Sequence, residues 1–463
     1  MSDDVTSNVV RPFYFVVVVW GERFRNYFLE YCLPSLLAPG NIPSIVLRRP
    51  AKYLVATTQA DWEVMQRTAI FATLKRYVEP VFIELPPCPP ERPYWFQNII
   101  GHKLCCDIVY RDKAYRLFSS PDAIFSDGSV ARMDQLARAG VEVVLKLTVP
   151  CSDEAAAFTT LDALGMLPKK SARDTGEPIS LSGRQLSSAL MQSMHGHSIV
   201  NEWDAPYFCG YASTPWWRVR GKNGEDGIVA FGFLWDVMLI DYAAVELHDA
   251  QILNDRGWDG DYIMSIVGDL KRLYFIRDSD EMNLMGWNFL PGPKLTRHPF
   301  GEVGKGLAFR TSYNRPTINR LHRSFFFIPT RIHTGQTSKD WDAAEQRALR
   351  TILTWTDPPA GISRLSSQLA SELRGPDPDQ RISQTVLPWW RRNSTLWAVF
   401  IRIATPALLG VAKVKPVLSR LSLVIKRIHL ACVGDIQAQQ WISWRLRKTL
   451  NLALKKPFNE PRP

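Results

Sequence analysis

The sequence has few cysteines, and they are not arranged to staple a fold or to hold a metal. Its 463 residues contain seven, an odd number without the paired spacing of a zinc or redox site. They are Cys32, Cys88, Cys105, Cys106, Cys151, Cys209 and Cys432. This excludes a disulfide-stapled scaffold and indicates buried or free thiols in a reducing compartment.

Targeting signals and several common catalytic motifs are also missing. The first four residues are acidic where a secretory leader is basic, and the apolar run at residues 16–19 is too short to span a membrane. G-x-G-x-x-G, G-x-S-x-G and H-E-x-x-H do not occur, and residues 301–306 lack the spacing of a Walker loop. We therefore expect a cytoplasmic chain whose chemistry uses none of these motifs.

The positive charge is confined to the end of the chain. Residues 385–463 contain 14 basic and two acidic residues, a net charge of +12, so residues 1–384 carry −1 of the total of +11. No basic stripe interleaved with aromatic residues runs through residues 1–384, which makes nucleic acid a disfavoured partner. A content of 46% hydrophobic and 22% charged residues excludes a disordered or collagen-like protein.

Residues 1–150 alternate between strand-like and helix-like segments. Strands are predicted at 13–20, 51–57, 81–85, 115–118 and 141–147, and helices at 24–37, 61–78, 94–118 (one long helix that overlaps the strand at 115–118) and 130–139. Asp61 is expected to cap its helix. Such alternation predicts an α/β fold with a mostly parallel central sheet.

Residues 151–355 read as a more helical half. Helices are predicted at 152–166, at 182–195 after the capping box Ser182-x-x-Gln185, and from a cap at Asp342-x-x-Glu345 to about residue 354; strands are predicted within 216–236 and at 273–277. This pattern predicts helical insertions in the fold. Residues 356–388 are proline-rich and predict a linker.

Residues 389–463 predict a basic, amphipathic, α-helical tail. Residues 396–412 are apolar except for Arg402, which lies near the centre, where a transmembrane helix tolerates charge poorly. A helix in the plane of the membrane surface fits better, with Trp389 and Trp390 at headgroup level and the neighbouring arginines on anionic phosphates. A hairpin packed on the body and a nucleic-acid-binding tail are the alternatives.

Carboxylates follow two of the predicted strands. Asp122 comes after the strand at 115–118, and Asp278 and Asp280 come after the strand at 273–277. In open α/β sheets ligands bind at the carboxyl ends of strands, and carboxylate oxygens suit magnesium or manganese. A structural alternative is open for each, because Asp122 can cap a turn and an acidic turn can simply be solvated. Asp261 lies in a similar but weaker acidic segment.

A histidine and a lysine precede the last predicted helix. In His333-Thr-Gly-Gln-Thr-Ser-Lys339, the imidazole could ligate a metal and the lysine could contact a phosphate. A single histidine is more often structural. The pair His195-Gly-His197 could also hold a metal, but it has no third ligand nearby in the sequence.

Together these segments resemble bacterial glycosyltransferases of the A-type, the nucleotide-diphospho-sugar transferase fold. The resemblance covers residues 13–150 and 225–350. It rests on three segments: the opening Val16-Val-Val-Val-Trp20-Gly with the following Phe28-Leu-Glu-Tyr-Cys-Leu-Pro-Ser, the region from Lys103 and Asp107 through Asp122 to Gly128, and His333, Lys339 and Trp341.

Each of the later segments differs from the family pattern at defined positions. Ser120 stands where the D-x-D motif has its first aspartate, which leaves Asp122 as the second. His333, Lys339 and Trp341 match the H-x-x-G-x-x-K-P-W motif of glycogenin-like enzymes and galactosyltransferases in spacing, with Gly335 one position early and Asp340 in place of proline.

The resemblance implies a nucleotide-sugar-binding half at 1–150 and an acceptor or catalytic half at 151–355, followed by the linker and the tail. The implied donor-binding residues are Trp20, Lys103, Asp107, Asp122 and Lys339, and the implied ligands for Mn²⁺ or Mg²⁺ are Asp122 and His333. Asp278, Asp280 or Asp261 would orient or deprotonate the acceptor hydroxyl.

The expected function is therefore a glycosyltransferase of the hexosyltransferase type. It would move a sugar from a nucleotide-diphosphate donor to a cell-envelope glycan or lipid-linked acceptor, and the tail would hold it at the inner face of the membrane. A catalytically inactive, glycosyltransferase-like scaffold on the membrane surface is the alternative, favoured by Ser120. A nucleic-acid binder that uses the tail is the third.

Overall fold

The computed structural model describes residues 11–88, 93, 96–147, 151–168, 176–208, 214–221, 226–245, 248, 272–295, 301–314, 323 and 325–356. The predicted tail, the predicted linker beyond Thr356, and Asp261 lie outside the described residues. No helix within the described residues is both long and apolar enough to cross a membrane.

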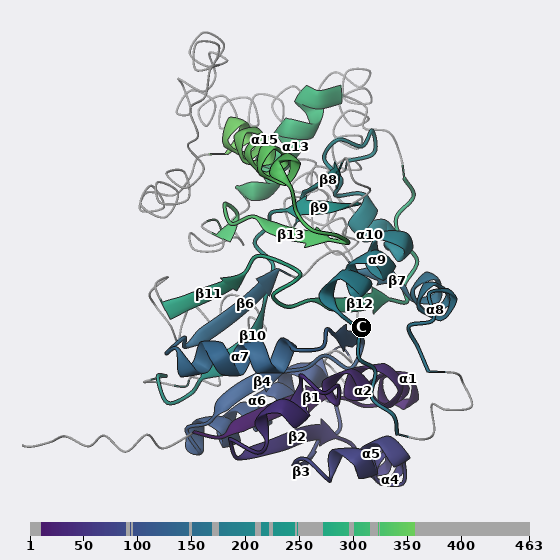
Figure 1. Ribbon diagram of the computed structural model, residues 1–463, viewed down its shortest axis with the longest axis vertical. Coiled ribbons are helices and arrows are strands. Elements are labelled where there is room, and N and C mark those ends of the chain that lie inside the picture. Colours follow the sequence, from purple (N-terminus) through teal and green to yellow (C-terminus); the bar gives the residue numbers. More distant parts are fainter. Residues whose placement is uncertain are drawn as a thin grey trace, which may run out of the picture.

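A seven-stranded sheet with the strand order β11-β6-β10-β4-β1-β2-β3 forms the centre of the structure (Figure 1). Its strands are β1 (Phe13–Val18), β2 (Ala51–Thr57), β3 (Glu79–Glu84), β4 (Tyr115–Phe118), β6 (Val143–Leu147), β10 (Trp235–Asp241) and β11 (Leu273–Ile276). β10 pairs antiparallel with β4 and β6, and the remaining pairs are parallel. The predicted α/β class with a mostly parallel sheet is confirmed.

β1 shows why the sheet is buried on both sides. Phe13, Phe15 and Val17 pack into one hydrophobic core, and the alternating residues of the same strand pack into a second core on the opposite face. Because successive side chains of a strand point to opposite faces, an unbroken apolar run predicts cover on both.

Helices from different parts of the chain supply that cover. The first core takes side chains from α1 (Glu22–Tyr27) with η1 (Phe28–Cys32) and α2 (Leu33–Leu36), from α3 (Ile42–Ile45), from α4 (Gln59–Gln66) and α5 (Ala69–Leu74), and from α7 (Ser129–Arg138). On the second face lies α6 (Phe96–Arg111).

Two three-stranded sheets complete the described structure. One has the order β5-β12-β7, with β5 (Ala123–Phe125), β12 (Leu284–Asn288) and β7 (Ser152–Asp153); the other has β13 (Thr330–His333), β9 (Asp226–Ala230) and β8 (Trp216–Arg220). The helices here are α8 (Glu154–Ala163), α9 (Gly183–Ser193), α10 (Gly196–Ile199), α13 (Gly301–Tyr313) and α15 (Lys339–Trp355). Figure 1 shows β8, β9 and β13 beyond one end of the central sheet; α15 packs on β8 and β9, and α13 packs against α15.

The predicted helix at 61–78 is wrong in its start and its continuity. Thr58 caps α4 by accepting a hydrogen bond from the Asp61 amide, and the chain breaks at Thr68 before α5 begins. The Asp61 carboxylate instead accepts from the Gly21 amide at 2.8 Å and pairs with Arg25 at 2.7 Å. It therefore stabilises the turn that follows β1, where Gly21 has a positive φ of 77°.

Two other predicted helices differ at their ends. The helix at 94–118 is wrong beyond Arg111, since the chain turns there and enters β4. Ser338, and not Asp342, caps α15. The Asp342 carboxylate instead pairs with Arg331 at 2.8 Å, outside the helix.

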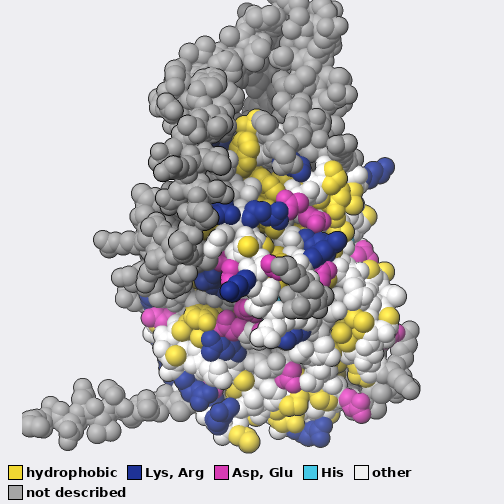
Figure 2. Space-filling view, turned by 45° about the horizontal axis from the view of Figure 1, so that its top comes forward, with side chains coloured by type: hydrophobic (Ala, Val, Ile, Leu, Met, Phe, Trp, Pro, Cys, Tyr) yellow, Lys and Arg dark blue, Asp and Glu magenta, His cyan; other side chains and the backbone are white. Residues whose placement is uncertain are grey.

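The described surface carries mixed charge. On the face shown in Figure 2, basic and acidic side chains are interspersed with hydrophobic ones. This agrees with the nearly neutral charge of residues 1–384.

The central sheet contains a buried lysine. Lys146 on β6 is 5% exposed and is the register partner of Asp236 on β10. Burial lowers the pKa of its ammonium group to about 8, and the charge of Asp236 opposes that shift only in part. Lys146 therefore loses its proton in the folded protein well before it does so in the unfolded chain.

We expect deprotonation of Lys146 to raise the free energy of unfolding between pH 8 and pH 10. The unfolded state keeps a proton on Lys146 that the folded state has released, so alkaline pH favours folding by about 2 kcal/mol over that window. Urea unfolding of the parent and of Lys146→Met checks this, because the substituted protein lacks the rise. Equal pH dependence of the two proteins would contradict it.

Candidate metal centre

Two loops that are distant in the sequence meet where the central sheet adjoins the sheet of β13. The Arg331 amide donates to the Arg277 carbonyl at 2.7 Å, and the Ser279 amide donates to the Arg331 carbonyl at 2.9 Å. The buried Ser279 hydroxyl also accepts from the His333 amide at 3.1 Å. These bonds place Asp278, which follows β11, beside His333, which ends β13.

The His333 ring has both nitrogens engaged. Nδ1 donates to the Gly335 carbonyl at 2.5 Å, which directs Nε2 to Oδ1 of Asp278 at 2.7 Å. With Nδ1 donating, the bond between Nε2 and that carboxylate oxygen requires a proton between the two atoms, and the charge of Asp278 favours its place on the imidazole. A metal ion can replace that proton, and the Nδ1 hydrogen bond is the kind that orients metal-binding histidines.

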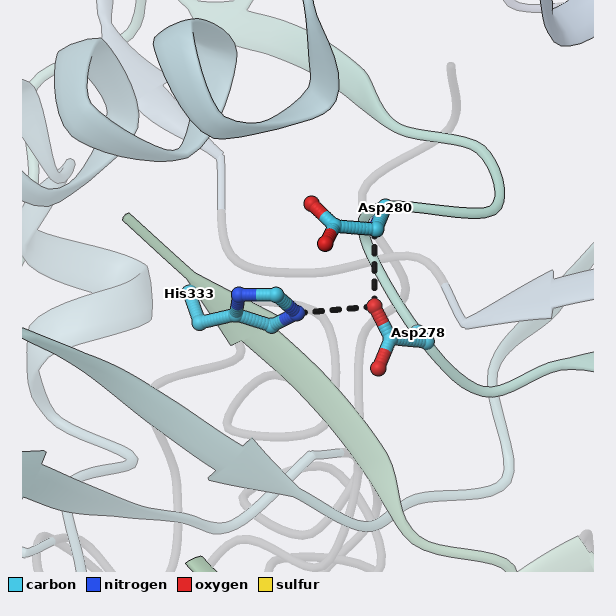
Figure 3. A group of neighbouring side chains, drawn as sticks. All are labelled: Asp278, Asp280 and His333. Carbon is cyan, nitrogen blue, oxygen red and sulfur yellow. Dashed lines mark hydrogen bonds and ion pairs between the residues drawn. The ribbon is translucent and has the colours of Figure 1, made fainter. Parts of the chain in front are cut away.

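Asp280 completes a group of three. Its amide donates to Oδ1 of Asp278 at 2.8 Å, and one ligand atom from each of Asp278, Asp280 and His333 lies within 4.8 Å of the others (Figure 3). Among the described residues, no other group of three or more acidic, histidine or cysteine side chains has this geometry. Two carboxylates and an imidazole form a donor set that suits manganese or magnesium.

The electrostatics agree with a charged pair at the centre. Burial acts to lower the pKa of His333, but the hydrogen bond and charge of Asp278 outweigh it and raise this pKa above its ordinary value. Burial acts to raise the pKa of Asp278, but bonds from His333 and from the Asp280 amide outweigh it and lower this pKa. Each group thus stabilises the charged form of the other.

The elements behind the histidine leave it little freedom. The fully buried Trp341 of α15 packs edge-on against the imidazole, with the ring centroids 5.5 Å apart. A Cβ atom at Gly227 on β9 would lie 2.2 Å from the Ile332 carbonyl oxygen and 2.6 Å from Trp341. Trp341, which matches the tryptophan of the sequence motif, is therefore a packing partner of His333.

The amino end of α9 docks on the acidic loop from the other side. A Cβ atom at Gly183 would lie 1.9 Å from the Ser279 carbonyl oxygen, and the Asn283 amide group donates to the Gly183 carbonyl at 3.1 Å. The capping box predicted from Ser182 and Gln185 is present here. Arg184, which follows Gly183, forms an ion pair with Asp280 at 2.6 Å.

Asp122 is the other metal ligand that the sequence resemblance implies. It lies between β4 and β5, is half-buried, and accepts a hydrogen bond from Ser120, while burial raises its pKa. It is not among the three grouped side chains, and the hydrogen bonds described for it do not reach His333. The two regions are nevertheless neighbours, since β5 pairs with β12, which follows the acidic loop.

The other predicted binding residues lie after β1, on α6 and at the start of α15. Trp20 follows β1 and is half-buried against Phe24, with the ring centroids 6.5 Å apart. Lys103 and the exposed Asp107 lie on α6, where Asp107 bonds to His248 at 3.0 Å. The exposed Lys339 begins α15. Their roles in binding stay predictions.

Comparison with known proteins adds little to this geometry. No protein-family model matches the chain, and no curated protein is similar to it in sequence. Among solved structures, the crystal structure of mouse xyloside xylosyltransferase 1 in its apo form matches 34% of this chain and 62% of its own length, at 8% identity and a TM-score of 0.23. A similarity at that level carries no argument about this chain, whose fold class rests on its own sheet.

Sequence reasoning missed two features of the centre. The sequence resemblance implies a metal-ligand role for His333 and a role at the acceptor hydroxyl for the two aspartates, whereas the structure groups all three. The sequence patterns also assign no role to Arg184, although the capping box predicts the start of its helix. A pattern within one helix could not show which distant carboxylate the arginine reaches.

We expect Gly183→Ala to destabilise the protein by about 2 kcal/mol or more, since the added methyl collides with backbone that cannot move aside. Chemical denaturation measures the loss. Gly286→Ala is the matched control, because its Cβ would meet the Asp122 carbonyl at an ordinary 3.4 Å. Equal stability of the two variants would show that α9 does not dock as described.

Proposed function

We propose that this protein is a metal-assisted glycosyltransferase that uses a nucleotide-diphosphate sugar as donor. The observation that carries the proposal is the group of Asp278, Asp280 and His333, which follows strand ends of an α/β fold with a mostly parallel sheet. Ligand sites of open α/β sheets lie beside strand carboxyl ends, and a cation held there can take an anionic ligand.

The three side chains fit a divalent cation on their own chemistry. His333 presents Nε2 with its other nitrogen fixed by Gly335, and one oxygen of each carboxylate lies within 4.8 Å of the other ligand atoms. When bound, such a cation supplies electrostatic stabilisation to the charge that develops on a departing diphosphate. Manganese accepts a mixed nitrogen and oxygen set readily, so we propose Mn²⁺ ahead of Mg²⁺.

This assignment gives the two aspartates a different role from the expected one. We propose them as cation ligands and not as bases for the acceptor, because a base must be free to take a proton whereas Asp278 is held charged by His333. Asp261 stays a predicted acceptor base. Asp122 stays a predicted donor contact; it directly precedes β5, which pairs with β12 after the acidic loop.

The remaining predicted residues would bind the donor around this centre. The exposed Lys339 would contact the diphosphate as a positive charge. Trp20, Lys103 and Asp107 would contact the nucleoside. Water must be kept from the reacting sugar carbon, since the transition state of sugar transfer has oxocarbenium character and water competes with the acceptor hydroxyl.

We propose a cell-envelope glycan or a lipid-linked sugar as the acceptor. The support is the net charge of +12 in residues 385–463, which suits an anionic membrane surface where such acceptors lie. An inactive, glycosyltransferase-like scaffold remains the second candidate, since Ser120 replaces the first acid of the D-x-D motif. Donor binding without any turnover would favour the scaffold.

The metal and the donor are tested together by thermal shift. With UDP-, GDP-, CMP- and dTDP-sugars, each with and without Mn²⁺, one nucleotide should stabilise the protein by about 2.7 kcal/mol at roughly a hundredfold excess over its Kd. The stabilisation should require Mn²⁺. We expect Asp278→Asn and His333→Gln each to need an about hundredfold higher concentration of Mn²⁺ for the same thermal shift, because each removes a ligand.

Two further variants decide between the possible metal sites. Asp204→Asn removes an exposed carboxylate whose partner is Arg347, and it should leave the response to Mn²⁺ unchanged. Asp122→Asn should keep the response to Mn²⁺ and weaken the response to the donor. Loss of the Mn²⁺ response in Asp122→Asn but not in Asp278→Asn would overturn the proposed centre in favour of the site expected from the resemblance.

The tail is tested by flotation with vesicles. Each basic residue near an anionic surface contributes about 1 kcal/mol of attraction, so the full chain should float with vesicles that contain phosphatidylserine. A protein of residues 1–384 should not float, and neither should the full chain with purely zwitterionic vesicles. Equal flotation of the two proteins would contradict a role for the tail in membrane binding.

A further inference from the structure

An arginine from α9 occupies the most accessible carboxylate of the candidate centre. Nε of Arg184 lies 2.9 Å from Oδ1 and 3.1 Å from Oδ2 of Asp280, and Nη2 lies 2.6 Å from Oδ2. The two side chains are 44% and 41% exposed. An ion pair in that much solvent contributes little to stability, so the contact is not one on which folding depends.

The guanidinium and a divalent cation compete for the same oxygens. Arg184 engages both oxygens of Asp280, whereas Asp278 is engaged by His333 and the Asp280 amide. A cation bound by all three side chains would also repel the guanidinium at close range. Binding of the cation by Asp280 therefore favours release of Arg184 from at least one Asp280 oxygen.

The backbone keeps the released arginine close to the centre. Gly183, directly before it, is packed against the Ser279 carbonyl, and the Asn283 side chain holds the Gly183 carbonyl at 3.1 Å. Ser182 and Gln185 close the capping box around the same turn. Arg184 can therefore change its side-chain direction, while its Cα stays next to the acidic loop.

We propose that Arg184 exchanges partners: it neutralises Asp280 in the cation-free protein and binds the phosphates of a diphosphate once a divalent cation has taken Asp280. The planar fork of a guanidinium matches phosphate oxygens as well as it matches a carboxylate. Because the arginine is released only when the cation is bound, the cation and the diphosphate favour each other's binding. This inference rests on the metal centre of the proposed function.

The test measures the two ligands separately in Arg184→Gln. Because the nucleoside is unidentified, two simpler probes are used. Binding of Mn²⁺ alone is monitored by the paramagnetic resonance signal of the free ion. Binding of inorganic pyrophosphate at saturating Mn²⁺ is measured by calorimetry. We expect Mn²⁺ to bind about fivefold more tightly, since its competitor is gone. Pyrophosphate should bind about tenfold more weakly, since its fork of donors is gone.

Two matched variants separate this role from a general loss of charge. Arg347→Gln removes another exposed arginine, paired with Asp204 at 2.8 Å, and should change neither affinity. Arg184→Lys keeps the charge without the fork, so Mn²⁺ should bind nearly as in the parent while pyrophosphate binds more weakly.

The outcomes distinguish this inference from the proposed function. Mn²⁺ binding that is lost in Asp278→Asn but unchanged in Arg184→Gln would overturn the exchange and leave the metal centre standing. Failure of pyrophosphate to bind the parent at saturating Mn²⁺ would overturn the phosphate role. Absence of Mn²⁺ binding in both the parent and Arg184→Gln would overturn the metal centre and the exchange together.

Discussion

The candidate centre depends on two backbone hydrogen bonds at Arg331. Through its amide and carbonyl, β13 is joined to the segment that follows β11, and so a three-stranded sheet is attached to the seven-stranded one. Asp278 and His333 are 55 residues apart in the chain, and this attachment brings Nε2 to 2.7 Å from Oδ1. Without it, a histidine and an acidic turn would be separate features of the surface.

Charge in this region is arranged so that each acid of the loop has a basic partner. Asp278 pairs with His333, Asp280 with Arg184, and Glu281 with Arg132 at 2.8 Å. Three acids in four residues would otherwise repel one another and raise their own pKa values. The two arginines are held differently. Arg132 also bonds to the Tyr274 hydroxyl, whereas the contact of Arg184 is exposed and can be displaced by a cation.

The elements that were predicted well are those whose signals are local. The apolar run that became β1 and the capping box of α9 are read from neighbouring residues, and the structure has both. The errors at Asp61 and Asp342 have one cause, since both carboxylates lie in the first turn of a helix but bind distant partners. A capping pattern states what a side chain can do locally and does not weigh it against an arginine from elsewhere.

The sequence by itself determined the class of the fold, because the alternation of apolar strands and amphipathic helices is a short-range property that backbone geometry and burial translate directly into a mostly parallel sheet. It also determined the segments that carry acids and histidine. Only the tertiary structure decided which of them meet. Asp278 and Asp280 lie beside His333 because β13 is hydrogen-bonded to the chain after β11, and Asp122 is not a member of that group. That pairing has no signal in the spacing of residues along the chain.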